Sequence, residues 1–246
     1  QSGYLAGYAA VALGYRKLAF LGGMAIPAVT KYGYGFVQGA NDAAKALGCV
    51  DDIRLDYAYC EQFFPDDSVE AYVDNWFANG TEVVFACGGG IYASAAAAAA
   101  KAGGKFIGVD VDQAPAVDGE FGEGLTLTSA MKGLGATVTA QLNKIANGTF
   151  TGGTDTLGIV SGDPAENNVA LAPSTQFNEN FTEADYRAML AKIASGELTI
   201  SDDLAERPAV DIFVDYNCYF GHDWNEPTYT WSEDNATVTA ERVCKN

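Results

Sequence analysis

Two aspartates and a lysine follow apolar stretches of the chain, at positions where their side chains could bind hydroxyl groups. Asp110 ends the apolar stretch "KFIGVD", so its carboxylate is expected at the tip of a strand. A carboxylate held there can accept hydrogen bonds from two vicinal hydroxyls, as acidic residues do for ribose. Asp112 is a neighbouring candidate, which can instead cap or orient the loop. Lys132 is expected one turn into the following helix, where its ammonium could pair with Asp110 and donate to a ligand oxygen.

Three consecutive glycines, Gly88, Gly89 and Gly90, follow a second apolar stretch, "VVFAC". They remove side chains from a strand-to-helix turn and leave backbone N–H groups and a helix N-terminus open to a ligand. The alternative is that they serve only close backbone packing. The pattern is neither G-x-G-x-x-G nor G-x-x-x-x-G-K-[ST], so a dinucleotide or P-loop site is poorly supported. Together with Asp110 and Lys132, the glycines predict a polar pocket that binds hydroxyls.

Reactive groups are scarce by comparison. The sequence has no metal-ligand cluster, no G-x-S-x-G motif and one histidine, His222, in the polar stretch "FGHDWNEP" that is typical of a surface loop. A single histidine argues against His-dependent zinc sites and a Ser-His-Asp triad. We therefore expect binding without catalysis, and neither a cofactor nor a metal.

Composition narrows the range of partners. Hydrophobic residues make up 48% of the 246 residues, and the net charge is −18, so nucleic acid and anionic lipid surfaces are disfavoured as partners. No run of 18 apolar residues is present. Cys49 with Cys60, and Cys218 with Cys244, are plausible disulfides, which would place the protein outside the reducing cytosol. Free thiols are the alternative, and Cys87 is expected to be a buried thiol.

The elements that position these residues alternate between strands and helices. The pattern predicts helices at 3–15, 30–47 (closed by Gly48), 67–80 and 91–102, and strands at 17–23, 50–59, 82–86 and 105–110. Short apolar strands that alternate with helices indicate a parallel sheet with right-handed crossovers and helices on both faces. Residues 16–128 are therefore predicted to form one α/β lobe.

Further along, the pattern predicts a long helix at 128–148, a strand at 154–162 and a helix within 180–198 that begins with a capping box of Thr182 and Asp185. From about residue 203 the chain mixes turns, aromatic residues and short strands. We interpret residues 203–246 as an irregular C-terminal extension.

Five stretches in this order resemble the basic membrane protein (BMP) family: "GYLAGYAAVAL", "KLAFLGGMAIPAVTKYGYGFVQGANDAAK", "VVFACGGG", "FIGVDVDQ" and "LTSAMKG". These proteins are lipoprotein substrate-binding components of ABC transporters, and the purine nucleoside receptors belong to them. The resemblance covers roughly residues 2–200. It implies a type I periplasmic-binding-protein fold, with a nucleoside in the cleft between two α/β lobes. It also implies a transporter permease as partner, and a location at the cell surface or in the periplasm with any lipid anchor outside this chain.

The resemblance also implies roles for individual residues. Asp110 would hold the ribose hydroxyls, Lys132 would contact the sugar or its neighbour, and Gly88 and Gly89 would let the ligand lie against the backbone. An aromatic residue at or near Phe85 would face the base. Tyr92 is the alternative for that role, and Phe85 can equally be a core residue.

Members of this family have further residues before the "YLAG" helix, so the first lobe is expected to be incomplete at the N-terminus. On that basis we assign residues 1–15 to the last helix of the first lobe, 16–128 to the second lobe, 129–202 to the crossover and first-lobe elements, and 203–246 to the extension. Two other functions remain open. One is a nucleoside- or sugar-processing hydrolase that uses Asp110 and Asp112 as acid and base, and the other is a surface sensor lipoprotein with a different ligand.

Overall fold

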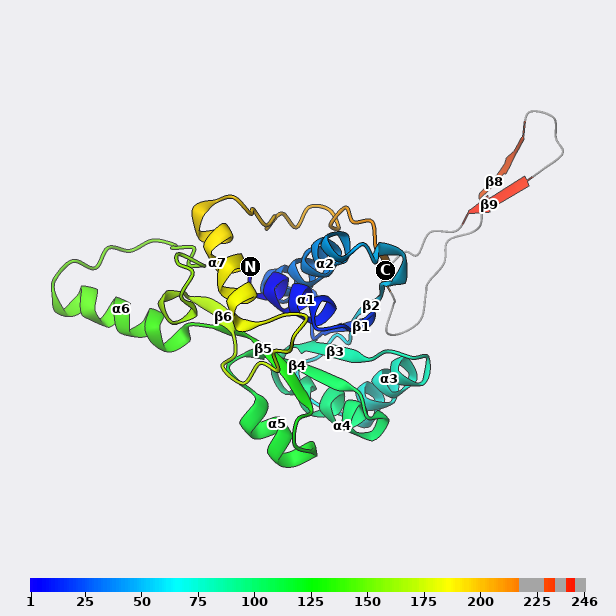
Figure 1. Ribbon diagram of the computed structural model, residues 1–246, viewed down its shortest axis with the longest axis horizontal. Helices are drawn as coiled ribbons and strands as arrows, with labels where there is room; N and C mark the ends of the chain where they lie inside the picture. Colours follow the sequence, from blue (N-terminus) through cyan, green and yellow to red (C-terminus); the bar gives the residue numbers. More distant parts are fainter. Residues whose placement is uncertain (217–227, 233–237, 242–246) are drawn as a thin grey trace.

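The computed structural model describes residues 1–216, 228–232 and 238–241. Its centre is a mostly parallel sheet with the strand order β6-β5-β4-β3-β1-β2-β7 (Figure 1). The strands are β1 (Lys17–Gly22), β2 (Arg54–Tyr59), β3 (Val83–Cys87), β4 (Lys105–Asp110), β5 (Thr126–Lys132), β6 (Val169–Leu171) and β7 (Phe213–Tyr216). Only β6 runs antiparallel to its neighbour, β5. The predicted α/β class with a parallel sheet is confirmed.

Helices cover both faces of the sheet, as predicted (Figure 1). One face carries α1 (Ser2–Ala12), α2 (Pro27–Leu47) and α7 (Glu183–Ser195), and the other carries α3 (Asp67–Ala78), α4 (Tyr92–Ala102) and α5 (Ala114–Phe121). Successive strand residues point to opposite faces. In β1, Phe20 lies in the core under α2, whereas Leu21 lies in the core under α3 and α4. Because both faces are buried, the strands are apolar throughout rather than alternating.

Glycines bring α1 and α2 into very close contact. A Cβ atom on Gly7 would overlap the main-chain oxygen of Phe36, and one on Gly39 would overlap that of Tyr4. No side chain larger than a hydrogen fits between the two backbones at these points. Ten of the eleven residues of α1 are buried in this packing. The assignment of α1 to the first lobe stays a prediction.

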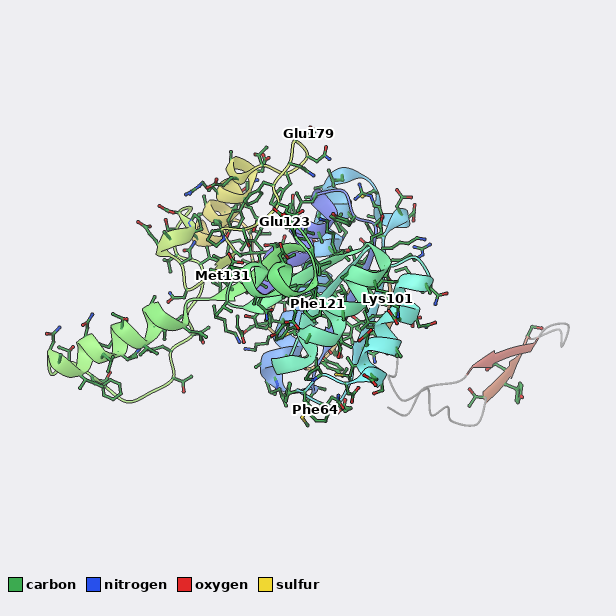
Figure 2. All side chains as sticks on the ribbon, turned by 90° about the horizontal axis from the view of Figure 1, so that it is seen from below. Phe64, Lys101, Phe121, Glu123, Met131 and Glu179 are labelled. Atoms are coloured by element: carbon green, nitrogen blue, oxygen red, sulfur yellow. The ribbon has the colours of Figure 1, made fainter. Side chains whose placement is uncertain are left out.

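Two elements project from this body (Figures 1 and 2). None of the residues of α6 (Leu134–Ala146) is buried. The strands β8 (Thr228–Trp231) and β9 (Val238–Glu241) form a separate antiparallel pair. Within the described residues, no helix is long and apolar enough to cross a membrane.

Several predicted boundaries of helices and strands were wrong, because the pairing of strands that are distant in the sequence overrides the hydrophobic pattern of each segment. The helix predicted at 128–148 begins only at Leu134, since Thr126–Lys132 forms β5 between β4 and β6. No strand forms at 154–162, and Val169–Leu171 pairs with β5 instead. The strand predicted at 50–59 begins at Arg54, after a 3₁₀ turn at Val50–Asp52. Two other 3₁₀ turns lie at Gly89–Ile91 and Pro164–Glu166. Helix α5, which begins at Ala114, was not predicted.

The C-terminal part also differs from the prediction. Residues 213–216 are β7, which extends the main sheet in register with β2. The Cys49–Cys60 disulfide is not formed, and both thiols are free. The extended strand β2 separates these two cysteines by about 20 Å, far beyond the reach of a disulfide. His222, Cys218 and Cys244 lie outside the described residues.

Candidate functional site

The candidate site lies at the carboxyl edge of the sheet. Strand β1 lies between β2 and β3, and successive connections lead to opposite sides of it. In open α/β sheets, ligands bind outside the carboxyl ends of the strands at such a switch point. Gly23, Gly88 and Gly133 directly follow β1, β3 and β5. Asp110 and Lys132 are the last residues of β4 and β5.

Asp110 and Lys132 meet at this edge. The Lys132 ammonium lies 2.8 Å from Asp110 Oδ1, and the side chains are 38% and 46% exposed for Lys132 and Asp110. The predicted pairing is therefore present, but its geometry differs from the prediction. Lys132 is the last residue of strand β5, not part of a helix, because β5 pairs with β4 with Met131 opposite Asp110. Two adjacent parallel strands thus place a cation and an anion side by side, still accessible to a ligand.

The backbone of Asp110 is unusual. Its φ is +68°, in the left-handed region, where aspartate is better tolerated than most residues other than glycine. This conformation turns the chain sharply at the end of β4. An aspartate held there against the local preference of the backbone is consistent with a functional carboxylate.

Tyr32, on α2, completes the polar cluster. Its hydroxyl lies 3.4 Å from Asp110 Oδ1 and 3.4 Å from the main-chain oxygen of Ala130, and the Lys132 ammonium lies 4.8 Å from the centre of its ring. Burial, and after it the charge of Asp110, raises the pKa of Tyr32 above its ordinary value. The phenol therefore remains a neutral hydrogen-bond donor. Tyr32 lies in the helix predicted at 30–47, and no local pattern signals its polar role.

The glycine turn has a clear packing role. Gly90 N donates to the main-chain oxygen of Phe63 at 2.7 Å, and a Cβ on Gly89 would lie 2.8 Å from the same oxygen. Gly88 and Gly89 have φ values of +156° and +54°. Close packing of the turn against Phe63 therefore accounts for the glycines. The exposed backbone of Gly89 still borders the edge of the sheet.

The structure favours the core alternative for Phe85. Its side chain is fully buried, and its ring centroid lies 5.4 Å from Phe20, 5.3 Å from Phe36 and 6.0 Å from Tyr32. Because β3 directs alternate residues to opposite faces, Phe85 points under α2 rather than out of the edge. Tyr92, the other candidate, is half-buried against the opposite core.

Two other aromatic residues lie at the edge. Phe63 is 37% exposed and its ring lies against Gly23 and Gly88, at the ends of β1 and β3. Phe64 is 61% exposed and lies at the rim of the body in Figure 2. The stretch "QFFPDD" directly after β2 could have signalled them, because strand-end loops carry ligand contacts in this class of fold. The exposed side chains of Met24, Ile26 and Val111 add apolar surface to the loops after β1 and β4.

Asp112 orients the loop after β4. Its Oδ1 accepts hydrogen bonds from Ser174 Oγ at 2.6 Å and from Ala114 N at 3.2 Å. This is the loop-capping alternative rather than the ligand-binding one.

Cys87 ends β3 beneath the polar cluster. It is buried, and burial followed by the charge of Asp110 raises the pKa of its thiol. Among the described residues, no cluster of histidine, cysteine, aspartate and glutamate could hold a metal ion.

Known proteins resemble this chain in sequence and in fold. Residues 1–200 match the Bmp family, described as ABC transporter substrate-binding protein PnrA-like. The chain is 30% identical over 168 residues to the "ABC transporter nucleoside-binding protein BmpA" of Lactococcus lactis subsp. cremoris, covering 63% of this chain and 46% of that protein. The chain therefore spans about half the length of this curated relative.

Solved structures with the same fold include two solute-binding proteins of ABC transporter systems. The Conexibacter woesei protein has a TM-score of 0.61 at 22% identity, with 82% of this chain and 63% of that chain covered. The Aeropyrum pernix protein has a TM-score of 0.60 at 18% identity, with 83% and 65% covered. At these identities the likeness concerns the fold alone.

Proposed function

We propose, from the premise that this chain belongs to the Bmp family of PnrA-like ABC transporter substrate-binding proteins, that it binds a nucleoside at the carboxyl edge of its sheet. The observation that carries the proposal is the accessible pair of Asp110 and Lys132 at the ends of β4 and β5, with the hydroxyl of Tyr32 beside it. The matched family is one of binding proteins rather than enzymes. The nucleoside-binding relative supports the ligand class, and a purine is the base that we propose.

The polar cluster has the chemistry to hold a ribose. Within the described chain, both contacts of the Asp110 carboxylate use Oδ1, which leaves Oδ2 to accept from a sugar hydroxyl. The Lys132 ammonium has three donors, of which one points to Asp110. Hydrogen bonds with an ionised partner are roughly twice as strong as neutral ones, so this pair can hold a sugar in one orientation.

Phe63 is the residue that we propose faces the base, in place of Phe85. Its ring lies over the glycines at the ends of β1 and β3 and retains exposed surface, whereas Phe85 is fully enclosed. An aromatic stack contributes about 0.5–1.5 kcal/mol beyond the area that it buries. Gly88 and Gly89 would then let the ligand lie close to the backbone beside this ring.

The first lobe would close over this edge. Helix α6 supports this proposal because its apolar side chains form one uncovered stripe, with exposures of 52–59% at Leu134, Val138, Leu142 and Ile145. A helix of this length is marginal in water unless its apolar face is packed. We infer that residues 129–202 include elements of the first lobe, and that ligand binding shifts the population of the two lobes towards closure.

In this function the protein would work outside the cytoplasm and present its ligand to a transporter permease. The proposed location is the cell surface or the periplasm, with attachment to the membrane through a lipid anchor outside this chain. The supporting observation is the family to which the chain belongs.

Calorimetry with inosine tests the proposal. We expect heat of binding for the unaltered protein and at least about tenfold weaker affinity for Asp110→Ala, the scale of a lost charged hydrogen bond. Asp51→Ala is the matched control, because this aspartate is exposed and lies far from the edge, in the turn before β2. Equal inosine affinity in all three proteins would refute the site. Chromatography of the incubated nucleoside separates binding from hydrolysis, because a hydrolase would release free base and ribose.

A further inference from the structure

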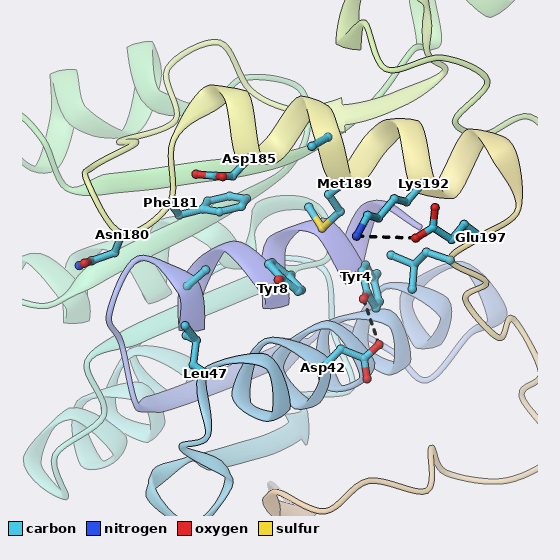
Figure 3. A pocket seen from close by; sticks show the side chains of 13 residues that line it. Tyr4, Tyr8, Asp42, Leu47, Asn180, Phe181, Asp185, Met189, Lys192 and Glu197 are labelled. Atoms are coloured by element: carbon cyan, nitrogen blue, oxygen red, sulfur yellow. Dashed lines mark hydrogen bonds and ion pairs between the residues drawn. The ribbon is translucent and has the colours of Figure 1, made fainter.

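A groove of about 530 Å³ opens on the outer side of α1, away from the sheet (Figure 3). Its walls are α1, the C-terminal half of α2 and α7. The side chains that line it from α1 are spaced four residues apart, at Tyr4, Tyr8 and Ala12, so they follow one face of the helix. A volume of this size lies within the range of small-molecule sites.

The floor of the groove is aromatic. The ring centroids of Tyr4 and Tyr8 are 6.2 Å apart at an interplanar angle of 30°, and those of Tyr8 and Phe181 are 5.8 Å apart at 51°. Figure 3 shows Tyr8 between the other two along the groove, with Met189 on the facing wall. Aromatic faces carry negative electrostatic potential, so they attract cations as well as apolar groups.

A carboxylate without a cationic partner lies beside these rings. Asp42 Oδ2 accepts from the Tyr4 hydroxyl at 3.0 Å, and Oδ1 accepts from Asn41 Nδ2 at 3.3 Å. Both donors are neutral. No lysine or arginine of the described chain forms an ion pair with Asp42, and the nearby Lys45 pairs with Asp211 at 2.7 Å. The half-buried carboxylate of Asp42 therefore has no cation in contact with it, and Lys45 acts on it only from a longer distance.

The other charged residues of the groove leave it with an excess of negative charge. Asp185 accepts from Thr182 N and Oγ in the capping box of α7, so it is a second carboxylate with neutral partners. Lys192 and Glu197 pair with each other at 3.7 Å and offset each other's charge. Burial, and after it the charges of Asp42 and Asp185, raises the pKa of Tyr8, so its hydroxyl stays neutral between two anions.

We propose that this groove binds a small organic cation, namely an ammonium group carried on an apolar or aromatic body. The ammonium would replace water around Asp42 and lie near the half-buried ring of Tyr8, while the body would lie along Phe181 and Met189. An anion of the same shape would meet two unneutralised carboxylates. A neutral molecule would bring no positive charge to the carboxylate of Asp42.

This site is separate from the proposed nucleoside site. Asp42 and Tyr32 are both on α2, ten residues apart, which corresponds to about 15 Å along a helix. Tyr32 faces the strand ends, whereas the groove opens on the other side of α1. A ligand in one site therefore does not occupy the other.

The test compares three ligands of similar shape by calorimetry at low ionic strength: phenethylammonium, phenylacetate and benzyl alcohol. We expect binding of phenethylammonium only, weakened by added salt. Asp42→Asn removes the charge but keeps an acceptor for Tyr4, and it should weaken phenethylammonium binding by at least about tenfold. Asp51→Asn, which removes one negative charge elsewhere, should leave the affinity unchanged.

A second variant covers the case in which Asp42→Asn does not fold, as judged by circular dichroism. Tyr8→Leu keeps an apolar side chain but removes the aromatic face, and it should also weaken the ammonium ligand severalfold. The proposal is overturned if phenethylammonium does not bind at millimolar concentration, or if phenylacetate binds equally well. It is also overturned if Asp51→Asn weakens binding as much as Asp42→Asn, because the attraction would then come from the net charge alone.

Discussion

The left-handed backbone of Asp110 leads to a prediction that separates binding from stability. With a φ of +68°, this residue accepts a conformation that glycine adopts without strain and alanine does not. Asp110→Ala and Asp110→Gly both remove the carboxylate, and with it the contacts to Lys132 and Tyr32. The two variants therefore lose the same ligand contacts and the same ion pair, and they differ only in backbone preference.

The expected difference in stability between the two variants follows from two opposing contributions. A left-handed conformation costs an L residue such as alanine about 1–2 kcal/mol. Glycine avoids that cost but has a more flexible unfolded chain, which lowers its stability by about 0.4–1 kcal/mol relative to alanine. The difference leaves Asp110→Gly more stable than Asp110→Ala by about 1 kcal/mol. For a chain of this length, that corresponds to a difference of about 3 °C in Tm.

Urea unfolding followed by circular dichroism measures the free energy of unfolding of both variants, and calorimetry with inosine measures binding. We expect equal losses of affinity and higher stability for the glycine variant. Equal stability, or a more stable alanine variant, would refute the argument from backbone strain. Retained affinity in Asp110→Gly alongside lost affinity in Asp110→Ala would instead show that the carboxylate is not the binding group.

Three further predictions concern packing, thiol chemistry and pH. Gly39→Ala should lower the free energy of unfolding by about 2–3 kcal/mol in urea titrations, because its Cβ would overlap the backbone of α1; a loss below about 0.5 kcal/mol would contradict the packing argument. Cys87 should react with iodoacetamide more slowly than Cys49 at pH 8 in peptide mass mapping, because burial raises its pKa and keeps it protonated; equal rates would count against its burial. Hydrogen bonds from Gln62 and the start of α3 lower the pKa of Asp66 from 3.8 to about 2, so the stability that it contributes should be complete above pH 3.8 and lost as the pH falls towards 2. In acid titrations of Tm, Asp66→Asn should flatten this loss, and an unchanged slope would exclude the assignment.

Two controls accompany these measurements. Gly152→Ala is the matched control for the packing variant, because nothing lies within 4 Å of a Cβ at Gly152 and its stability should change little. In the presence of unfolding concentrations of urea, the two cysteines should react with iodoacetamide at similar rates, because the difference in burial is then lost.

Local patterns predicted the elements whose determinants are close together in the sequence. Gly48 ends α2 with a φ of +66°, as expected of a glycine C-cap, and the capping box of Thr182 and Asp185 is present. Both features depend on residues within one helical turn, so the sequence contains all the information that they need. The strand-end position of Asp110 was predicted for the same reason.

Pairing partners far away in the chain decided the rest of the site. Residues 126–132 have no pattern that excludes a helix, and they are a strand because β4 and β6 lie on either side. This assignment moves Lys132 to the strand end beside Asp110. Likewise, the orientation of β3 turns Phe85 into the core, and the loop after β2 brings Phe63 to the glycines of β1 and β3.

By itself, the sequence determined that this is an α/β chain with an acidic strand end, a glycine turn and the features of a family of binding proteins. Only the tertiary structure decided which side chains share the edge of the sheet: Tyr32 joins the polar cluster, Phe63 lies there whereas Phe85 lies in the core, and Asp112 serves its own loop. The physical reason is that strand ends, helix ends and loops meet through sheet register and helix packing. Both depend on contacts between residues that are tens of positions apart in the chain.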